Sequence, residues 1–343
     1  MKINLRSDTV TKPTVAMRMA MMDAIVGDDV YEEDPTVIEL EQLAATMLHK
    51  EAALFVPSGT FCNQLAIMTH TRRGDEILVG DASHILIHEV GAAAVLSQVQ
   101  TRSLHAPRGI IDPEELRRKI RPDDIHEPPT GLICIENAHS AGTVVPLENM
   151  QEVYAIAREH QIPVHLDGAR LFNAATALHV EAYELAVCSD SVNICLSKGL
   201  SAPIGSLLVG TEEFIRRARK NRKLMGGGMR QVGTLAAAGI LSLKEMTKRL
   251  DIDHANARFL AEALADIPGI QVFFDRCAIN MVFLTIDSPI SDEEFVRRLD
   301  EKGFVISGVW EGEYRFVTHN DVTREDAQRF ADSVREILTE DIV

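Results

Sequence analysis

The feature that most restricts the fold of this chain is a repeated alternation between short apolar segments and amphipathic ones. Apolar runs of strand length occupy residues 76–80, 131–137, 162–168, 191–197 and 205–210. Segments at 112–121, 147–160 and 211–224 lie between them and carry apolar residues at helical spacing. Because the strands are apolar on both faces, this order predicts an α/β fold with helices covering a mostly parallel sheet.

The segment before this alternation carries clear helix signals. Residues 34–49 are predicted to form a helix, since Asp34 can cap it and Pro35 suits its first turn. A further strand is expected at 52–56, followed by the turn Pro-Ser-Gly-Thr and a second helix from about Thr60. The large sheet therefore begins early in the chain.

The pattern changes in the last third of the 343 residues. A long helical stretch at 231–266 precedes predicted strands at 269–274, 280–286 and 314–319, with helices at 291–302 and 323–338. This order indicates a smaller α+β domain. We expect a large domain over residues 1–245, including an N-terminal arm, and a small domain over 246–343.

Composition excludes several classes of partner and site. The formal net charge of −16 disfavours binding to nucleic acid or to an anionic membrane surface. None of the five cysteines forms a C-x-x-C pair, which argues against a disulfide framework and a zinc site, and no metal site is predicted. The first residues, MKINLRSDTV, contain no apolar signal segment, so a cytoplasmic protein is expected.

Chemistry-bearing side chains follow several of the predicted strands. Asp167 is expected at the carboxyl end of strand 162–168, on the same face as His165, and ligands of open α/β sheets bind off that edge. A simpler alternative is an Asp167–Arg170 ion pair that only fixes the loop. Lys198 ends strand 191–197, where a neutral amine could form a Schiff base, or it could simply reach to water.

Two weaker signals point to the same edge. Between strand 52–56 and the next helix, Gly59 and Thr60 could bind a phosphate with backbone N–H groups and a hydroxyl, although ordinary helix capping explains most such turns. His84 follows strand 76–80 and could stack on an aromatic ligand or transfer a proton, or be purely structural. Together with Asp167 and Lys198, these groups match pyridoxal 5′-phosphate.

Longer motifs then identify a family. The chain resembles the low-specificity L-threonine aldolases, which are pyridoxal-phosphate enzymes of fold type I, like aspartate aminotransferase. The resemblance covers nearly the whole chain and is carried by LRSDTVTKP (5–13), GDDVYEEDPTV (27–37), PSGTFCN (57–63), HLDGARLFNA (165–174), ICLSKGLSAPIGSLLVG (194–210) and GGGMRQ (226–231). It implies a seven-stranded type of sheet in the large domain.

The resemblance also implies roles for the cofactor-binding residues. Lys198 would hold pyridoxal phosphate as a Schiff base, Asp167 would bind its pyridinium nitrogen, and His84 would stack on its ring. Gly59, Thr60 and Ser197 would hold the phosphate group.

Further roles concern the substrate and the assembly. Arg170 would lie near the ring hydroxyl and the substrate carboxylate, and Arg315 and Ser7 would bind that carboxylate. A homotetramer with shared sites is implied, to which a neighbouring subunit would supply Lys223 and Arg230 near the phosphate, with Tyr31 near the shared site. His84 and His126 are the candidates for the catalytic base.

These roles imply cleavage of L-threonine, L-allo-threonine and other β-hydroxy-α-amino acids to glycine and an aldehyde. Two alternatives remain open at this point. One is a pyridoxal-phosphate-dependent β-eliminating lyase that acts on a small amino acid, since a fold does not fix which bond breaks. The other is a ligand-binding protein that has kept the fold without turnover.

Overall fold

A seven-stranded sheet organises most of the chain, as the computed structural model of the protein, which describes residues 2–340, shows. Its strand order is β2 (Ala52–Val56), β8 (Ser206–Gly210), β7 (Ser191–Cys195), β6 (Val164–Gly168), β5 (Thr130–Glu136), β3 (Glu76–Gly80) and β4 (Gln100–Leu104). β8 runs antiparallel to the other six strands, which all run in the same direction. The predicted α/β fold with a mostly parallel sheet is thus confirmed.

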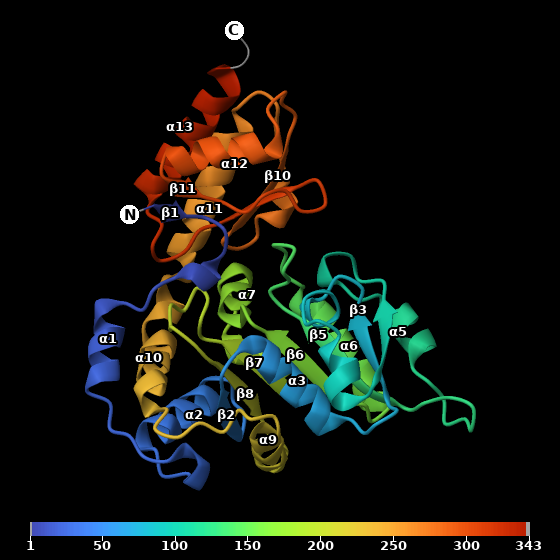
Figure 1. The fold of residues 1–343 in the computed structure, drawn as a ribbon. Coiled ribbons are helices and arrows are strands. Elements are labelled where there is room, and N and C mark those ends of the chain that lie inside the picture. Colours follow the sequence, from blue (N-terminus) through green and yellow to red (C-terminus); the bar gives the residue numbers. More distant parts are fainter. Residues whose placement is uncertain (1, 341–343) are drawn as a thin grey trace.

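Helices cover this sheet in the lower part of Figure 1. They are α1 (Val15–Met22), α2 (Pro35–Met47), α3 (Gly59–His70), α4 (His84–Ile87), α5 (Pro113–Lys119), α6 (Leu147–Glu159), α7 (Leu171–Leu178), α8 (Ala182–Ala186), α9 (Glu212–Leu224) and α10 (Gly233–Lys244). Asp34 caps α2 as predicted, accepting from the Thr36 N–H, and its other oxygen accepts from the Gly233 N–H, 2.8 Å away, at the start of α10. One carboxylate therefore joins two helix starts.

Three local predictions differ from the structure. Strand β4 was not predicted, because its sequence, QTRSL, is polar and it lies at the sheet edge. The helical stretch at 231–266 is divided into α10, a 3₁₀ turn (Met246–Arg249) and α11 (Leu250–Ala265). Strand β7 ends at Cys195, so Lys198 lies in the following turn and not at the end of the strand.

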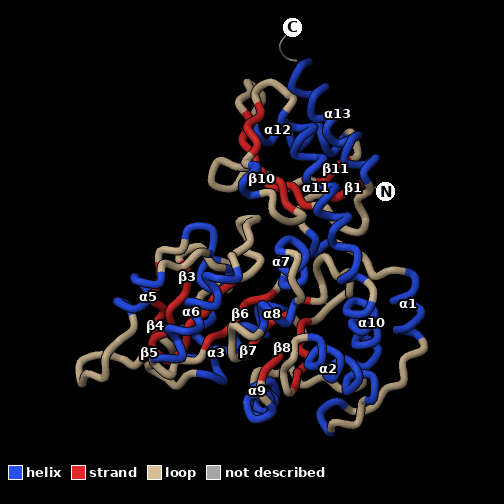
Figure 2. Tube along the Cα trace, turned by 180° about the vertical axis from the view of Figure 1, so that it is seen from behind, coloured by secondary structure: helices blue, strands red, loops and turns tan. Residues whose placement is uncertain are grey.

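A smaller three-stranded antiparallel sheet, in the order β12 (Tyr314–Val317), β10 (Met281–Ile286) and β9 (Ile270–Val272), lies in the upper part of Figure 1 with α11, α12 (Asp292–Glu301) and α13 (Arg324–Glu340). The N-terminal strand β1 (Ile3–Asn4) pairs with β11 (Phe304–Val305), and Leu5 packs into the same core. Figure 2 shows this part from behind, with the N-terminus beside β11. The boundary at residue 245 stays a prediction.

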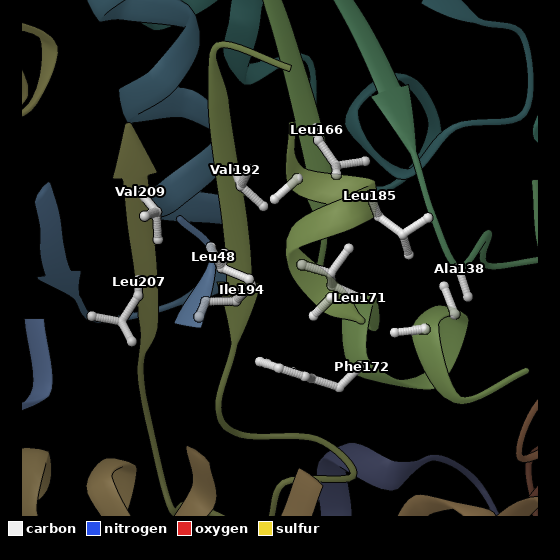
Figure 3. Packing of buried hydrophobic residues seen from close by; sticks show 14 of the residues in the cluster. Leu48, Ala138, Leu166, Leu171, Phe172, Leu185, Val192, Ile194, Leu207 and Val209 are labelled. Carbon is white, nitrogen blue, oxygen red and sulfur yellow. The ribbon is translucent and has the colours of Figure 1, made fainter. Parts of the chain in front are cut away.

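Apolar side chains fill the space between the large sheet and its helices. Leu166 on β6 and Val192 and Ile194 on β7 are fully or almost fully buried, and they pack with Leu171 and Phe172 of α7 (Figure 3). Each such side chain contributes roughly 1.5–3 kcal/mol through burial. This packing makes the strand ends a firm support for a site. Among residues 2–340, no helix combines the length and apolar character that crossing a bilayer requires.

Candidate active site

The carboxyl ends of the parallel strands bring the predicted residues to one edge of the sheet. Asp167 lies on β6, His84 follows β3, and Lys198 follows β7. Strand β2 is antiparallel to β8, which is itself antiparallel to β7, so β2 points the same way as β7 and delivers Gly59 to the same edge. This is the edge at which open α/β sheets bind ligands.

Asp167 is held firmly and is only 2% exposed. Its Oδ2 accepts from Asn63 Nδ2 at 2.7 Å, and its Oδ1 accepts from Asn193 Nδ2 at 3.2 Å and from the Ala169 N–H at 3.1 Å. The alternative Asp167–Arg170 ion pair is wrong, because Arg170 pairs with a different carboxylate. Asp167 is thus a buried acid at the strand end.

His84 begins α4 beside this carboxylate. Its Nδ1 lies 2.9 Å from Glu89 Oε1, and its backbone N–H donates to Glu136 Oε2 at 2.8 Å. The side chains of His84, Glu89 and Asp167 have nitrogen or oxygen atoms within 4.8 Å of one another. The hydrogen bond to Glu89 raises the pKa of His84 above its ordinary value against the effect of burial, and the Asp167 charge adds to the rise.

The turn that carries Lys198 is fixed through its backbone. The Lys198 carbonyl accepts from Thr11 Oγ1 at 2.8 Å and from the Ser201 N–H at 2.9 Å. The positive charge of Lys198 contributes to the pKa shifts of both Asp8 and His84, so its amine lies within electrostatic reach of both. Within residues 2–340 the Lys198 amine has no hydrogen-bond or ion-pair partner, which leaves it available to a ligand.

The predicted phosphate-binding residues lie close together at the start of α3. The Gly59 and Thr60 N–H groups precede the first hydrogen bond inside the helix, so they can face an anion. Ser197 Oγ is 3.5 Å from Cys195 Sγ, and that sulfur would lie 3.8 Å from a Cβ on Gly59. Ser206 Oγ, which would lie 3.7 Å from the same Cβ, is buried without a hydrogen-bond partner among the described residues.

Two arginines form a cationic region next to these groups. Arg170 donates from Nε to Asp8 Oδ2 at 2.8 Å and from Nη2 to Asp8 Oδ1 at 2.6 Å. Arg315 on β12 has no ion-pair partner among residues 2–340, and burial and then the charge of Arg170 lower its pKa. Ser7 caps the 3₁₀ turn that contains Asp8, accepting from the Thr9 N–H. Residues from both sheets and the N-terminal segment therefore meet here.

The residues expected from a neighbouring subunit are all exposed in the single chain. Arg230 Nη1 donates to Asp28 Oδ2 at 2.8 Å, and its guanidinium lies 6.0 Å from the centre of the Tyr31 ring. Tyr31 is 70% exposed. Lys223 lies near the end of α9, beside Gly228. The structure places these groups together on a surface.

His126, the second candidate for the catalytic base, also lies away from this edge. It lies exposed in the loop between α5 and β5, where its N–H donates to Asp124 Oδ1 at 2.8 Å. Glu136, which contacts His84, lies at the other end of β5, and the strand from Thr130 to Glu136 spans about 20 Å. A catalytic part for His126 therefore requires another subunit.

Several polar residues at the site were not predicted from sequence, and four of them contact the predicted residues through their side chains. Asn63 contacts Asp167 from α3, and Asn193 contacts it from β7. Asp8 pairs with Arg170, and Glu89 contacts His84. A polar side chain in the apolar strand 191–197 was a usable signal for Asn193, whereas the other three depend on contacts between distant segments.

The arrangement fits pyridoxal phosphate. A buried carboxylate on Asp167 suits a pyridinium nitrogen, the free amine of Lys198 suits an aldehyde, and the donors near Gly59, including the unpartnered Ser206 hydroxyl, suit a phosphate. The Lys198 amine and the Asp167 carboxylate both lie within electrostatic reach of His84, so the imidazole is close to the groups that would hold the cofactor.

Comparison with known proteins agrees with this chemistry. The beta-eliminating lyase family profile matches residues 4–287. A low specificity L-threonine aldolase of Escherichia coli (strain K12) is 45% identical over 341 residues, which cover 98% of this chain and 99% of that protein. A low-specificity L-threonine aldolase 1 of Arabidopsis thaliana is 42% identical over 332 residues, covering 94% of this chain and 93% of that protein.

Solved structures show the same fold. A threonine aldolase of Leishmania major superposes with a TM-score of 0.82 at 20% identity and covers 98% of this chain and 100% of that one. At this identity the likeness concerns the fold, which is fold type I. The sequence relatives carry the closer relationship: this chain belongs to the beta-eliminating lyase family and, within it, to the low-specificity L-threonine aldolases, which are pyridoxal-phosphate-dependent lyases.

Proposed function

We propose that this chain cleaves L-threonine, L-allo-threonine and other β-hydroxy-α-amino acids to glycine and an aldehyde. The observation that carries the proposal is the meeting of Asp167, His84 and the Lys198 amine at one sheet edge, beside Arg170 and Arg315. The 45% identity to an enzyme named for this reaction supports it over the whole chain.

The residues present would hold pyridoxal phosphate at three points. Lys198 would bind it covalently, Asp167 would pair with its ring nitrogen, and Gly59, Thr60 and Ser197 would hold its phosphate. Bound there, the cofactor supplies an aldehyde that condenses with amines and a ring that withdraws electrons from bonds at the substrate Cα. Asp167 is suited to keep that ring protonated, because three N–H donors already fix its carboxylate in place.

The arginines bind and orient the amino acid. A carboxylate accepts two parallel hydrogen bonds from a guanidinium, and Arg315 has no competing ion-pair partner among the described residues. Ser7 would add a hydroxyl donor. Holding the carboxylate fixes rotation about the bond between the substrate nitrogen and Cα. This rotation determines which bond at Cα breaks.

Cleavage also needs a base for the β-hydroxyl proton. His84 is the candidate within the chain, because its Nδ1 is engaged by Glu89 and its Nε2 is left to accept a proton, directly or through water. The Cα–Cβ bond breaks as the hydroxyl becomes the aldehyde carbonyl, and a proton returned to Cα gives glycine. General-base catalysis of this kind increases the reaction rate by about 10²–10⁴-fold.

We also propose that the active enzyme is a cytoplasmic homotetramer with shared sites. Four proposed site residues, namely Tyr31, His126, Lys223 and Arg230, are exposed in the single chain. Large apolar side chains on and after α1 are exposed as well, with Val15 and Met22 both at 76%. The five free cysteines are compatible with a reducing compartment.

Product analysis tests the proposed reaction. The protein loaded with pyridoxal phosphate is incubated separately with L-threonine and L-allo-threonine. Glycine and acetaldehyde in equal amounts are expected from both. Formation of 2-oxobutanoate and ammonia would instead establish β-elimination, and a colour change without any product would indicate binding alone.

A further inference from the structure

The carboxylate that contacts His84 Nδ1 is buried and has several further partners. Glu89 lies just beyond α4 and is only 1% exposed. It accepts three hydrogen bonds from side chains: from His84 Nδ1 at 2.9 Å, from Asn63 Nδ2 at 2.8 Å and from Gln64 Nε2 at 2.6 Å. A buried carboxylate is costly unless it is satisfied in this way, so the arrangement is a built site and not a chance contact.

These contacts fix where the protons lie. An ionised carboxylate can only accept, so the His84 Nδ1 must carry the proton that is shared with Glu89. The neutral imidazole then has a free lone pair on Nε2. A carboxylate in this position therefore selects one of the two tautomers and also restricts rotation of the ring.

The same carboxylate is tied to the residue that would pair with the cofactor nitrogen. The two protons of Asn63 Nδ2 are directed to Glu89 Oε1 and to Asp167 Oδ2, at 2.8 and 2.7 Å. Asn63 Oδ1 accepts in turn from His165 Nε2 at 3.1 Å and from Asn193 Nδ2 at 3.0 Å. The orientation of the Asn63 amide is thus determined on both sides, and this amide holds the two acids in a fixed relation.

We propose that Glu89 is a positioning residue that fixes His84 in the tautomer with Nε2 unprotonated, and that Asn63 joins this pair to Asp167. The role of Nε2 as the base rests on the proposed aldolase function. The tautomer itself does not, because the surrounding contacts determine it. Glu89 acts only through the imidazole and touches no reacting atom.

Other charges also act on the His84 imidazole, so the contribution of Glu89 has to be separated from theirs. The titratable and charged groups that face it, or contact its backbone, are Asp167 on β6, Glu136 on β5, Lys198 after β7, and His88 and Glu89 on its own segment. The His88 ring is 5.5 Å away, centre to centre. Glu136 contacts only the backbone N–H of His84, which makes it a matched control for Glu89.

The first test determines the tautomer of His84 in the unaltered protein. Protein labelled with carbon-13 in its histidine rings is followed by NMR from pH 5 to 9, with and without pyridoxal phosphate, and a His84→Asn variant identifies the His84 signals. The ring-carbon shifts of neutral His84 are expected to show a proton on Nδ1. A proton on Nε2 in the wild-type protein would overturn the proposal, whatever reaction the protein catalyses.

The second test compares Glu89→Gln with Glu136→Gln. Loss of a charge in contact with His84 is expected to lower the pKa of His84 by about one unit or more in the first variant, and by less in the second. The acid limb of kcat/KM should move to lower pH with it, and kcat should fall at least about tenfold. An unchanged His84 pKa in folded Glu89→Gln protein would overturn the positioning role. A moved pKa in a protein without aldol cleavage would contradict the proposed function alone.

Discussion

The Arg170 guanidinium donates hydrogen bonds to both carboxylate oxygens of Asp8, with Nε 2.8 Å from Oδ2 and Nη2 2.6 Å from Oδ1. The two residues are 162 positions apart in the sequence. Asp8 is fully buried, and Asn280 from the small-sheet side also donates to it at 3.3 Å. The charge of Arg170 holds the pKa of Asp8 well below its usual range although burial opposes this. Asp8 therefore joins the N-terminal segment, the large sheet and the small sheet at the proposed substrate site.

An Asp8→Asn variant is expected to bind amino acids poorly and to be less stable. Removing one partner of a buried ion pair leaves the other charge uncompensated, at a cost of about 3–5 kcal/mol in the free energy of unfolding. Denaturant unfolding and the KM for L-threonine measure the two effects. As a control, Glu39→Gln removes an exposed pair with Lys244 and should cost no more than about 1 kcal/mol. An equal decrease in the free energy of unfolding in the two variants would contradict a buried ion pair between Asp8 and Arg170.

Substitution of Arg315 should affect the substrate and spare the cofactor. In Arg315→Ala the KM for L-threonine is expected to rise roughly tenfold to a hundredfold, the range expected from loss of a charged hydrogen-bonding partner worth about 1.5–3 kcal/mol. Pyridoxal phosphate affinity, measured by absorbance titration, should change little. Arg329→Ala, on the exposed surface of α13, is the matched control and should leave KM unaltered. A normal KM in Arg315→Ala would remove this arginine from the substrate site.

Two histidines, the buried His165 and the partly buried His70, should make the fold sensitive to mild acid. Burial lowers the pKa of His165 to about 4 and that of His70 to about 3. Both are neutral in the folded state. Their contribution to the free energy of unfolding is therefore fully present above the ordinary histidine pKa near 6.5, and it is lost as the pH falls toward their pKa values in the folded state. The free energy of unfolding should decrease from pH 6.5 to 4.5. In His165→Asn the slope should be smaller by up to about 1.4 kcal/mol per pH unit; an identical slope would show that His165 is not buried in its neutral form.

Sharing of sites between subunits can be tested by complementation. Lys198→Ala and Arg230→Ala are each expected to have little activity alone. When both chains are produced together, one of the two sites in a mixed pair contains both an intact Lys198 and an intact Arg230, and the other site contains neither. Half of all randomly formed pairs are mixed, so about a quarter of the sites should be restored. Light scattering would establish the assembly size. If mixed assemblies form and recover no activity, Arg230 does not act on a neighbouring site.

The large sheet and its edge could be predicted because their signals are local. Alternating apolar and amphipathic segments define the strands, and a polar residue at a strand end, such as Asp167, stands out against them. Strand β4 lacks an apolar run and was missed for that reason. The N-terminal strand β1 is two residues long, and its partner β11 lies about 300 residues away in sequence, so no local pattern reveals the pair.

The partners of the site residues were harder to predict than the residues themselves. Spacing suggested that Arg170 would pair with Asp167, but the folded chain brings Asp8 to it from the N-terminal segment. Asn63 and Glu89 contact each other only because α3 packs against the segment after α4. Pairing between distant segments is a property of the fold, which sequence spacing alone does not encode.

The central claim is that the Lys198 amine binds pyridoxal phosphate opposite Asp167. Its most direct test is borohydride reduction of the loaded protein, followed by proteolysis and mass spectrometry. The pyridoxyl mass is expected on Lys198, within the sequence NICLSKGLS, and Asp167→Asn should weaken cofactor binding without moving that mass. Attachment to any other lysine, or no attachment in folded and loaded protein, would contradict the account.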